Sequence, residues 1–426
     1  MTQDPVLRAI FEIVERSFPT LFSGVPREHR FGLPSGLRTD VSPSMSPSDE
    51  EAVRSALAQD PLLKQFSGTD GHGPFLMTSL AGGWRVEPNQ LVPTLIGSAG
   101  RELLGRALPM DDLSVFLDVV EQHLVSFRAL LEGQIVDVLA VTPFEGFALE
   151  DGVRVRVPWG TLRPAMPYEK NNQPFGRVET SVVMESWLPF QMKADESADA
   201  RVGDATALRD LEAGSTRLVL ALLLAHYTGP GSPIADEKWR TIIVPGQRGS
   251  SFSGRGLFTR AMPRAEPPIL SDHEVRELES WALRVEEAYD PSIRIAARRL
   301  ITAIHERMSP EDVLIDSVMV WENLFGHGES SETKFRVTSA IALLLEQDSM
   351  QREIMRRELG KIYDARSKVV HGGEVTKKQG LQTMQARAVE VARQCLRELF
   401  LKKPALLRER DRGIRLIMGT KEPQGG

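Results

Sequence analysis

The chain has 426 residues, a formal charge of −6 at pH 7 and a pI near 5.9. At about 150 residues per domain, this length predicts two or three domains, each with its own hydrophobic core. Hydrophobic residues make up 41% and charged residues 26%, which excludes a wholly disordered chain. The longest apolar run, residues 218–225, is far shorter than the about 20 residues of a membrane-spanning helix. We therefore expect a soluble, cytoplasmic protein that does not enter a membrane.

Charge is distributed unevenly along the chain. Residues 351–426 contain 18 Lys or Arg against 9 Asp or Glu, whereas residues 271–350 contain 8 against 16. A basic segment beside an acidic one favours contact with a polyanion. The alternative is that solvated helices carry Lys and Arg on their outer faces, and composition leaves it open.

Residues 1–131 are predicted to be mostly helical. Helices are expected over residues 5–18 and 111–131, where apolar side chains recur on one face. A linker at residues 32–47 precedes a further helix, which Ser48 and Glu51 are expected to open as a capping box.

Residues 132–268 are predicted to form a β-rich region with an inserted helix. Val, Ile, Thr and Trp are frequent here, and they alternate in QIVDVLAV, VRVRVPWG, RVETSVVMESWLPF and WRTIIVP, which predicts a small sheet. The inserted helix is expected over residues 205–227, with its LVLALLLA core buried. The glycine-rich segment PGQRGSSFSGRG lacks the G-K-[ST] of a phosphate-binding loop, so we interpret it as a surface loop.

Residues 271–410 are predicted to form an all-α bundle, and residues 411–426 a tail. Asp290-Pro291 and Ser309-Pro310 each supply an N-cap followed by a proline in the first helical position. The glycines after His371 are expected to end a helix. Six helices are expected, over residues 271–289, 292–308, 311–325, 333–346, 350–370 and 377–401. The predicted fold class is therefore α+β, with a mixed N-terminal region that contains a small β-sheet and a helical C-terminal region.

Few motifs for chemistry are present. The sequence has no Walker A, dinucleotide-binding, G-x-S-x-G or H-E-x-x-H motif, and its 8 His and 1 Cys show no metal-ligand spacing. We expect no cofactor and no metal site. Cys395 has Val391 and Leu399 as helical neighbours, which predicts a buried thiol rather than a nucleophile.

One arrangement does point to a reaction, namely Arg366-Ser-Lys-Val-Val-His371 at the end of a predicted helix. Because an α-helix turns about 100° per residue, the two side chains lie within roughly 140° of each other around the helix axis. Arginine binds phosphate through a permanent charge, and histidine transfers protons near neutral pH. The pair suits attack on a phosphodiester by the 2′-hydroxyl of RNA itself. A similar pair, Arg299 and His305, lies mid-helix among apolar residues, and we interpret it as structural.

The segment YDARSKVVHGG, residues 363–373, resembles the signature helix of HEPN domains, in particular the Apea-like HEPN group of bacterial proteins. Residues 309–346 are similar to the same group, with an acidic helix ending in E-x-L-F, a polar loop and a helix rich in Ala and Leu. The resemblance covers about residues 290–400. It implies a helical HEPN domain and a metal-independent endoribonuclease, in which two protomers bring their R-x4-H motifs together.

The resemblance also implies roles for individual residues. Arg366 would bind the scissile phosphate, and His371 would transfer a proton. Ser367 stands where the family usually has a polar residue, Lys368 is a further supporting residue, and Glu322 matches an acidic position that would orient Arg366. A tyrosine often follows two residues after the histidine in HEPN toxins that are paired with a nucleotidyltransferase antitoxin, and here Gly373 replaces it. The glycine argues against control by modification at that position.

The implied partners are RNA, a second copy of the chain bound through the helical region, and a phage-derived or nucleic-acid trigger. The N-terminal region would sense this trigger in anti-phage defence or in a toxin. Two alternatives stay open. Arg366 could simply pair with Asp364 or Glu358, and the helical region could be a non-catalytic module for RNA binding or dimerisation.

Overall fold

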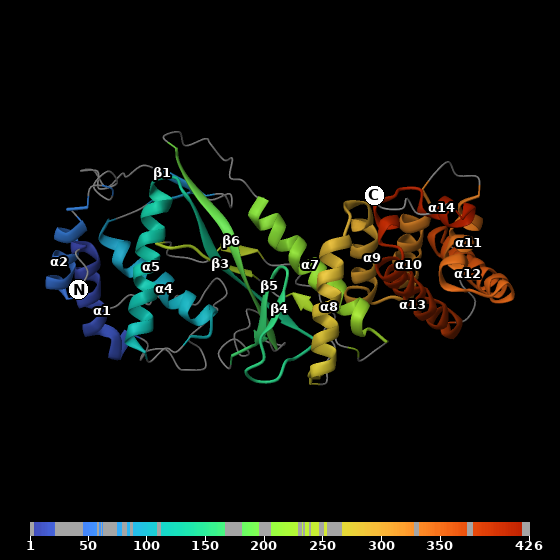
Figure 1. The fold of residues 1–426 in the computed structure, drawn as a ribbon, viewed down its shortest axis with the longest axis horizontal. Coiled ribbons are helices and arrows are strands. Elements are labelled where there is room, and N and C mark those ends of the chain that lie inside the picture. Colours follow the sequence, from blue (N-terminus) through green and yellow to red (C-terminus); the bar gives the residue numbers. More distant parts are fainter. Residues whose placement is uncertain are drawn as a thin grey trace. The chain divides into compact units, whose positions relative to one another are not determined.

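The protein is a mixed α+β chain with an antiparallel sheet and a helical C-terminal region in the computed structural model (Figure 1). It forms two compact units, one of residues 1–214 and 237–255, the other of residues 215–236 and 256–426. The residues that the structure describes are 4–21, 46–57, 59–60, 62, 75–78, 83–85, 88–108, 112–166, 181–195, 206–228, 232, 235–237, 240–246, 251–253, 266–327, 332–372 and 378–419.

The sheet of the first unit is built around two long neighbouring strands, β3 and β6. They pair antiparallel from Ile135 opposite Gln191 to Phe144 opposite Val182. On the other edge of β6, β5 pairs with the start of the strand and β1 with its end, while β8 pairs with β3. The path across the sheet runs β2-β1-β6-β3-β8-β9. The strands are β1 (Phe75–Thr78), β2 (Gly83–Arg85), β3 (Ile135–Glu145), β4 (Val155–Val157), β5 (Gly160–Pro164), β6 (Val182–Asp195), β7 (Asp236–Glu237), β8 (Arg240–Ile243) and β9 (Ser251–Ser253).

Five of these strands, β1, β2, β5, β7 and β9, were not predicted. The strands β1 and β2 lie in the region expected to be mostly helical, and β1 joins the sheet through β6. The strand β9 lies within PGQRGSSFSGRG, so the loop prediction is wrong for those three residues. Short strands of two to five residues carry too little alternation to be recognised without their partners. Residues 247–250 and 254–256 of that segment lie outside the described residues.

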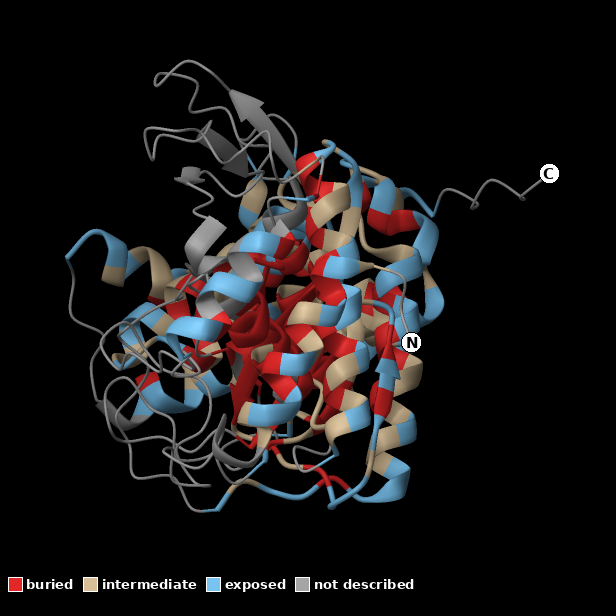
Figure 2. Ribbon diagram, turned by 90° about the vertical axis from the view of Figure 1, so that its left-hand side faces the viewer, coloured by how far each residue is buried: buried red, intermediate tan, exposed pale blue. Residues whose placement is uncertain are grey.

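Two helices of the first unit contact this sheet, and two others pack mainly on those helices. They are α1 (Pro5–Leu21), α2 (Pro47–Leu57), α4 (Pro88–Gly105) and α5 (Leu113–Leu131). Helix α5 contacts both β3 and β6, and it buries an apolar face that includes Phe116, Leu124 and Phe127. Figure 2 shows the buried residues gathered on the inner sides of helices and strands.

The N-cap of α2 differs from the prediction. Ser46, rather than Ser48, accepts a hydrogen bond from the backbone N–H of Asp49, at 3.2 Å, and the Asp49 carboxylate accepts one in return from the N–H of Ser46, at 3.3 Å. Pro47 then occupies the first helical position, which its fixed φ favours. The linker predicted at residues 32–47 lies mostly outside the described residues.

The described part of the second unit is mainly helical. Its helices are α7 (Thr206–His226), which belongs to this unit from Ser215 onward, α8 (Asp272–Ala288), α9 (Arg294–His305), α10 (Pro310–Phe325), α11 (Thr333–Leu345), α12 (Ser349–Val370), α13 (Lys378–Lys402) and α14 (Arg412–Met418), with short 3₁₀ helices η1 (Pro291–Ile293) and η2 (Pro404–Arg408). Between residues 290 and 400, the described part of the chain contains no strand, as predicted.

The end of α7 belongs with these helices, although the sequence placed it in the β-rich region. Leu218 to Leu224 are buried. The His226 ring hydrogen-bonds to the carbonyl of Glu274 at 2.9 Å, and Arg217 pairs with Glu286 at 2.6 Å. The two compact units therefore differ from the predicted boundary near residue 270.

Helix α10 is the centre of the bundle. It contacts α9, α11, α12, α13 and α14, and its Trp321 side chain is fully buried. The last of these neighbours lies in the predicted tail, so that prediction is wrong for Arg412–Met418. Arg412 is buried and donates hydrogen bonds to the carbonyls of Leu406 and Leu407 at 2.9 Å. A single buried arginine that caps a preceding turn gives little sequence signal, because Arg is usually a surface residue.

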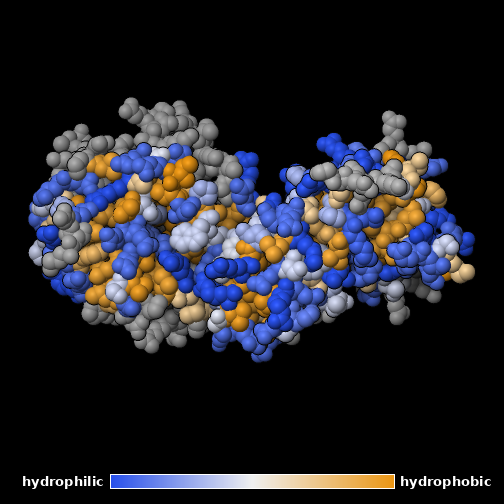
Figure 3. All heavy atoms as spheres, viewed as in Figure 1, coloured by the Kyte–Doolittle hydropathy of each residue, from blue (hydrophilic) through white to orange (hydrophobic). Residues whose placement is uncertain are grey.

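No helix in the described part of the chain is long and apolar enough to cross a bilayer. On the face shown in Figure 3, hydrophobic residues occur as separate patches between hydrophilic ones.

Candidate active site

Glu322 is held near the C-terminal end of α10. Ser309 caps the start of this helix by accepting from the N–H of Asp312 at 3.1 Å, and Pro310 takes the first helical position. After Phe325 the helix stops at Gly326, where a Cβ would lie 2.6 Å from the carbonyl oxygen of Glu322. A glycine is therefore required here, and the turn fixes the backbone that carries Glu322.

Arg366 and His371 lie at the C-terminal end of α12. Asp348 caps the start of this helix, and His371 is its C-terminal cap, with its N–H donating to the carbonyl of Ser367 at 3.1 Å. Gly372 follows with φ +74°, a left-handed conformation that ends helices and that glycine adopts without strain. The predicted glycine stop is thus present at Gly372, and Gly373 lies outside the described residues.

The structure brings Glu322 and Arg366 together, although 44 positions separate them in the chain. Arg366 Nη2 lies 3.2 Å from Glu322 Oε2, and the two side chains are 22% and 27% exposed. The Nε atom of Arg366 is buried and has no hydrogen-bond partner among the described residues. The guanidinium is therefore anchored through one nitrogen.

Tyr363 also binds Glu322, and the sequence analysis did not identify it. Its hydroxyl donates to Glu322 Oε1 at 2.5 Å, so one carboxylate receives a phenol and a guanidinium from the same face of α12. Burial, together with the hydrogen bond to Glu322, raises the pKa of Tyr363 above its ordinary value. The available signal was its position three residues before Arg366, since residues at i and i+3 share a helix face.

The remaining predicted residues face solvent to different degrees. His371 and Lys368 are exposed, Ser367 is half-buried, and their side chains have no hydrogen bond or ion pair within the described residues. At about 100° per residue, His371 lies roughly 140° around the helix axis from Arg366. No hydrogen bond joins the two side chains within the described residues. The chain thus presents an anchored arginine on one flank of α12 and an exposed histidine on another.

The two alternative partners of Arg366 are engaged elsewhere. Asp364 pairs with Lys334 of α11 at 2.6 Å, and Glu358 pairs with Arg387 of α13 at 3.1 Å. Arg366 therefore pairs with Glu322, the partner that the resemblance implied.

The basic C-terminal segment uses much of its charge internally. Arg356 and Arg357 bind Glu353, and their hydrogen bonds lower the pKa of Glu353 to about 2. Arg412 is buried, and Arg397 donates to the carbonyl of Leu224. The local positive charge available to an outside polyanion is therefore smaller than the residue count indicates.

Two further kinds of site, a reactive cysteine and a metal centre, were considered from the sequence. Cys395 is fully buried, and burial raises the pKa of its thiol, as expected for a structural cysteine. Among the described residues, no three His, Cys, Asp or Glu side chains are grouped to hold a metal ion.

Comparisons with protein-family models, with curated proteins and with solved structures find no match to this chain. The resemblance to HEPN domains therefore stays a prediction from the residues named above.

Proposed function

We propose that the helical region is a HEPN-type, metal-independent endoribonuclease, with Arg366 and His371 as its catalytic residues. The observation that carries the proposal is the arrangement around the end of α12, where Arg366 is anchored on Glu322 and His371 is exposed at the helix terminus. An anchored guanidinium is preorganised to bind a phosphate, and an exposed imidazole is accessible to a ribose hydroxyl.

The reaction follows from these two groups. A base takes the proton of the 2′-hydroxyl, the 2′-oxygen attacks the adjacent phosphorus, and the bond to the 5′-oxygen breaks. The leaving 5′-oxygen takes up a proton, so the products are a 2′,3′-cyclic phosphate and a 5′-hydroxyl. His371 transfers a proton in this sequence, while Arg366 stabilises the charge that develops on the phosphate oxygens.

A second protomer would complete the site. Arg366 and His371 lie on different flanks of α12, so one chain supplies a sparse catalytic set. A homodimer through the helical region would place two such sets together. Light scattering at micromolar concentration, with and without RNA, checks this assembly, and a monomer of 47.3 kDa under both conditions would contradict it.

The deciding experiment incubates end-labelled RNA with purified full-length protein and its His371→Ala variant in EDTA. We expect the wild type to cut the RNA and leave 2′,3′-cyclic phosphate ends, and the variant to be slower by about 10²–10⁴-fold. A substrate with a 2′-deoxy residue at the cleavage position should resist both proteins. Equal cutting by the two proteins would place the active site elsewhere.

The alternative is a non-catalytic module for RNA binding or dimerisation. The observation that favours it is the ion pair of Arg366 with Glu322, which offsets the arginine charge. Such a module would retain RNA in a salt-dependent manner, tolerate His371→Ala and never shorten the RNA. The same incubation, followed by a filter-binding assay at several salt concentrations, separates the two functions.

The biological role we propose is anti-phage defence or growth arrest as a toxin, with the first unit sensing a phage-derived or nucleic-acid trigger. Host survival during infection, compared between wild type and His371→Ala, tests this role. Identical protection by both proteins would remove RNA cleavage from it.

A further inference from the structure

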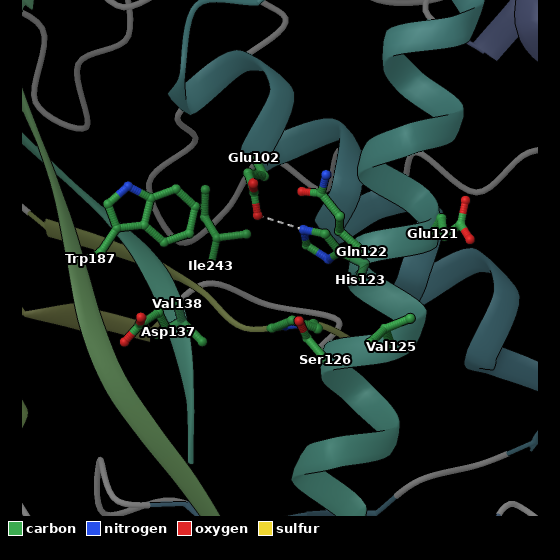
Figure 4. Close-up of a pocket in the computed structure, with 11 residues that line it drawn as sticks. Glu102, Glu121, Gln122, His123, Val125, Ser126, Asp137, Val138, Trp187 and Ile243 are labelled. Carbon is green, nitrogen blue, oxygen red and sulfur yellow. Dashed lines mark hydrogen bonds and ion pairs between the residues drawn. The ribbon is translucent and has the colours of Figure 1, made fainter. Parts of the chain in front are cut away.

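The first unit contains a cavity of about 400 Å³ that the proposed reaction does not use. It lies where α4, α5 and the strands β3, β6 and β8 meet (Figure 4). Its size falls within the range of small-molecule sites, about 300–1,000 Å³. Its described lining residues are Glu102, Glu121, Gln122, His123, Val125, Ser126, Asp137, Val138, Trp187, Ile243 and Pro245.

One wall of the cavity is a buried hydrogen-bonded network. The Nε2 atom of His123 lies 2.8 Å from Glu102 Oε2, and the two side chains are only 2% and 9% exposed. The Nδ1 atom of His123 lies 2.9 Å from Ser98 Oγ, which also accepts from the N–H of Gly246 at 3.3 Å. Burial opposes ionisation of Glu102, but the hydrogen bonds and charges of His123 and Arg106 lower its pKa below the ordinary value. The Glu102 carboxylate is therefore held in place between His123 and Arg106.

Trp187 forms the opposite wall, and it is 50% exposed. In Figure 4 its ring projects from β6 toward the side where Ile243, Glu102 and His123 lie. The guanidinium carbon of Arg106 is 5.8 Å from the ring centroid, and Arg106 also pairs with Glu102 at 3.1 Å. The protein thus already holds one organic cation of its own on this indole and this carboxylate.

A second carboxylate stands next to Trp187. Leu139 of β3 is directly opposite Trp187 of β6, so Asp137, two residues earlier, is a diagonal neighbour of Trp187 on the same face of the sheet. Asp137 is exposed, and it makes no ion pair within the described residues. The described lining residues include no Lys or Arg, and Glu121 and Asp137 stand as acidic residues beside the ion pair of Arg106 with Glu102.

We infer that this cavity binds an organic cation with an alkylammonium group, seated between the Trp187 ring and the Asp137 carboxylate beside the Glu102–His123 pair. An indole face attracts a cation electrostatically, and a neighbouring carboxylate adds to this attraction. The Asp137 and Glu121 carboxylates disfavour a phosphate or carboxylate ligand. A free amine and a lysine side chain of a partner protein both present this alkylammonium group.

The first test uses isothermal titration calorimetry of the full-length protein with cadaverine and with 1,5-pentanediol. The diol has the same chain length but carries hydroxyl groups in place of the ammonium groups. We expect cadaverine to bind and the diol not to bind. Equal binding of the two compounds, or binding of neither, would overturn the proposal.

Variants locate the binding. Trp187→Leu is expected to weaken cadaverine binding about tenfold, and Trp187→Phe by less, because phenylalanine keeps a smaller aromatic face. Asp137→Asn should weaken it about two- to fivefold. The matched control is Asp118→Asn, an exposed acidic residue of α5 that does not line the cavity. Equal affinity in the two Asp variants, or full affinity in Trp187→Leu, would contradict the assignment.

The source of the cation is tested with Nα-acetyl-lysine methylamide beside cadaverine. Tighter binding of the capped lysine supports a partner protein, and tighter binding of cadaverine supports a free amine. Circular dichroism of each variant confirms that it is folded, so that a loss of binding reports on the site.

Discussion

Two Arg–His pairs lie on helices of the same bundle, and their surroundings differ. On α9, Arg299 pairs with Asp316 at 2.7 Å, the other oxygen of Asp316 holds Arg307 at 2.6 Å, and His305 is 4% exposed. On α12, Arg366 pairs with Glu322, whose other oxygen accepts from Tyr363, and His371 is exposed. In both places an acidic residue on α10 anchors an arginine from a neighbouring helix.

The comparison shows which features distinguish the two pairs. Arg366, the arginine of the proposed site, is less exposed than Arg299, at 22% against 36%. Greater exposure of the arginine therefore does not mark the proposed site. The histidine does, because each lies at the end of its helix but His305 is enclosed by the bundle, whereas His371 is exposed next to Gly372. The second partner of the carboxylate also differs. Asp316 meets two positive charges and Glu322 meets one, together with a neutral phenol.

The largest expected effect concerns catalysis. Arg366→Lys should lower the rate of RNA cleavage by about 10²-fold or more, because lysine keeps the charge but loses the planar, two-pronged contact with phosphate. Arg299→Lys is the matched control and should leave the rate unchanged. Single-turnover cleavage of labelled RNA measures both rates. Equal losses in the two variants would mean that the arginines act only through the fold.

The next effect concerns stability, and here we expect the substitution beside Arg299 to have a larger effect than the one beside Arg366. Asp316→Asn removes a 1% exposed carboxylate that binds two arginines, and it should cost about 2–3 kcal/mol of the free energy of unfolding. Glu322→Gln, at a 27% exposed side chain, should cost about 1 kcal/mol. Urea unfolding followed by circular dichroism measures the difference. A larger loss in Glu322→Gln would show that the site on α12 is the structural one.

The helices of this bundle could be predicted because their signals are local. Ser309 and Pro310 open α10, and the glycine after His371 ends α12, each within a few residues of the boundary. The N-cap of α2 was misplaced because Ser46 and Ser48 offer the same chemistry, and only the backbone decides between them. The strands β1 and β9 depend on partners far along the chain, and short strands carry little pattern of their own.

The site could be predicted only in part, for the same reason. Arg366 and His371 stand five positions apart and were found from spacing. Their link to Glu322 came from a family resemblance, since nothing in the spacing of 44 residues indicates a contact. Tyr363 was missed although it lies one turn before Arg366, because a tyrosine on a helix usually serves packing. The cavity beside Trp187 forms where two helices and three strands meet, and no local sequence pattern indicates it.

A smaller effect concerns pH. The pKa of Tyr363 is raised by burial and by Glu322, so the folded protein keeps the phenol proton at a pH where the unfolded chain releases it. This contribution to stability is present below about pH 10 and is lost as the pH rises above it. The unfolding free energy of wild type should therefore fall more steeply above pH 10 than that of Tyr363→Phe. Parallel slopes for the two proteins would contradict the raised pKa.

The smallest effect isolates one hydrogen bond. Tyr363→Phe keeps the ring and removes the hydroxyl that donates to Glu322, so we expect a loss of about 0.5–1.5 kcal/mol in the free energy of unfolding at neutral pH. Tyr289→Phe is the matched control, because the Tyr289 ring lies against Arg217 at 5.0 Å and its hydroxyl has no hydrogen bond within the described residues. The control should therefore change stability little. If Tyr363 also positions Glu322, and through it Arg366, its phenylalanine variant should lower the rate of RNA cleavage by more than Tyr289→Phe does, even after both proteins are confirmed to be fully folded at the assay temperature. A cleavage rate unchanged from wild type would limit Tyr363 to a structural contact. Glu322 alone would then be sufficient to anchor Arg366.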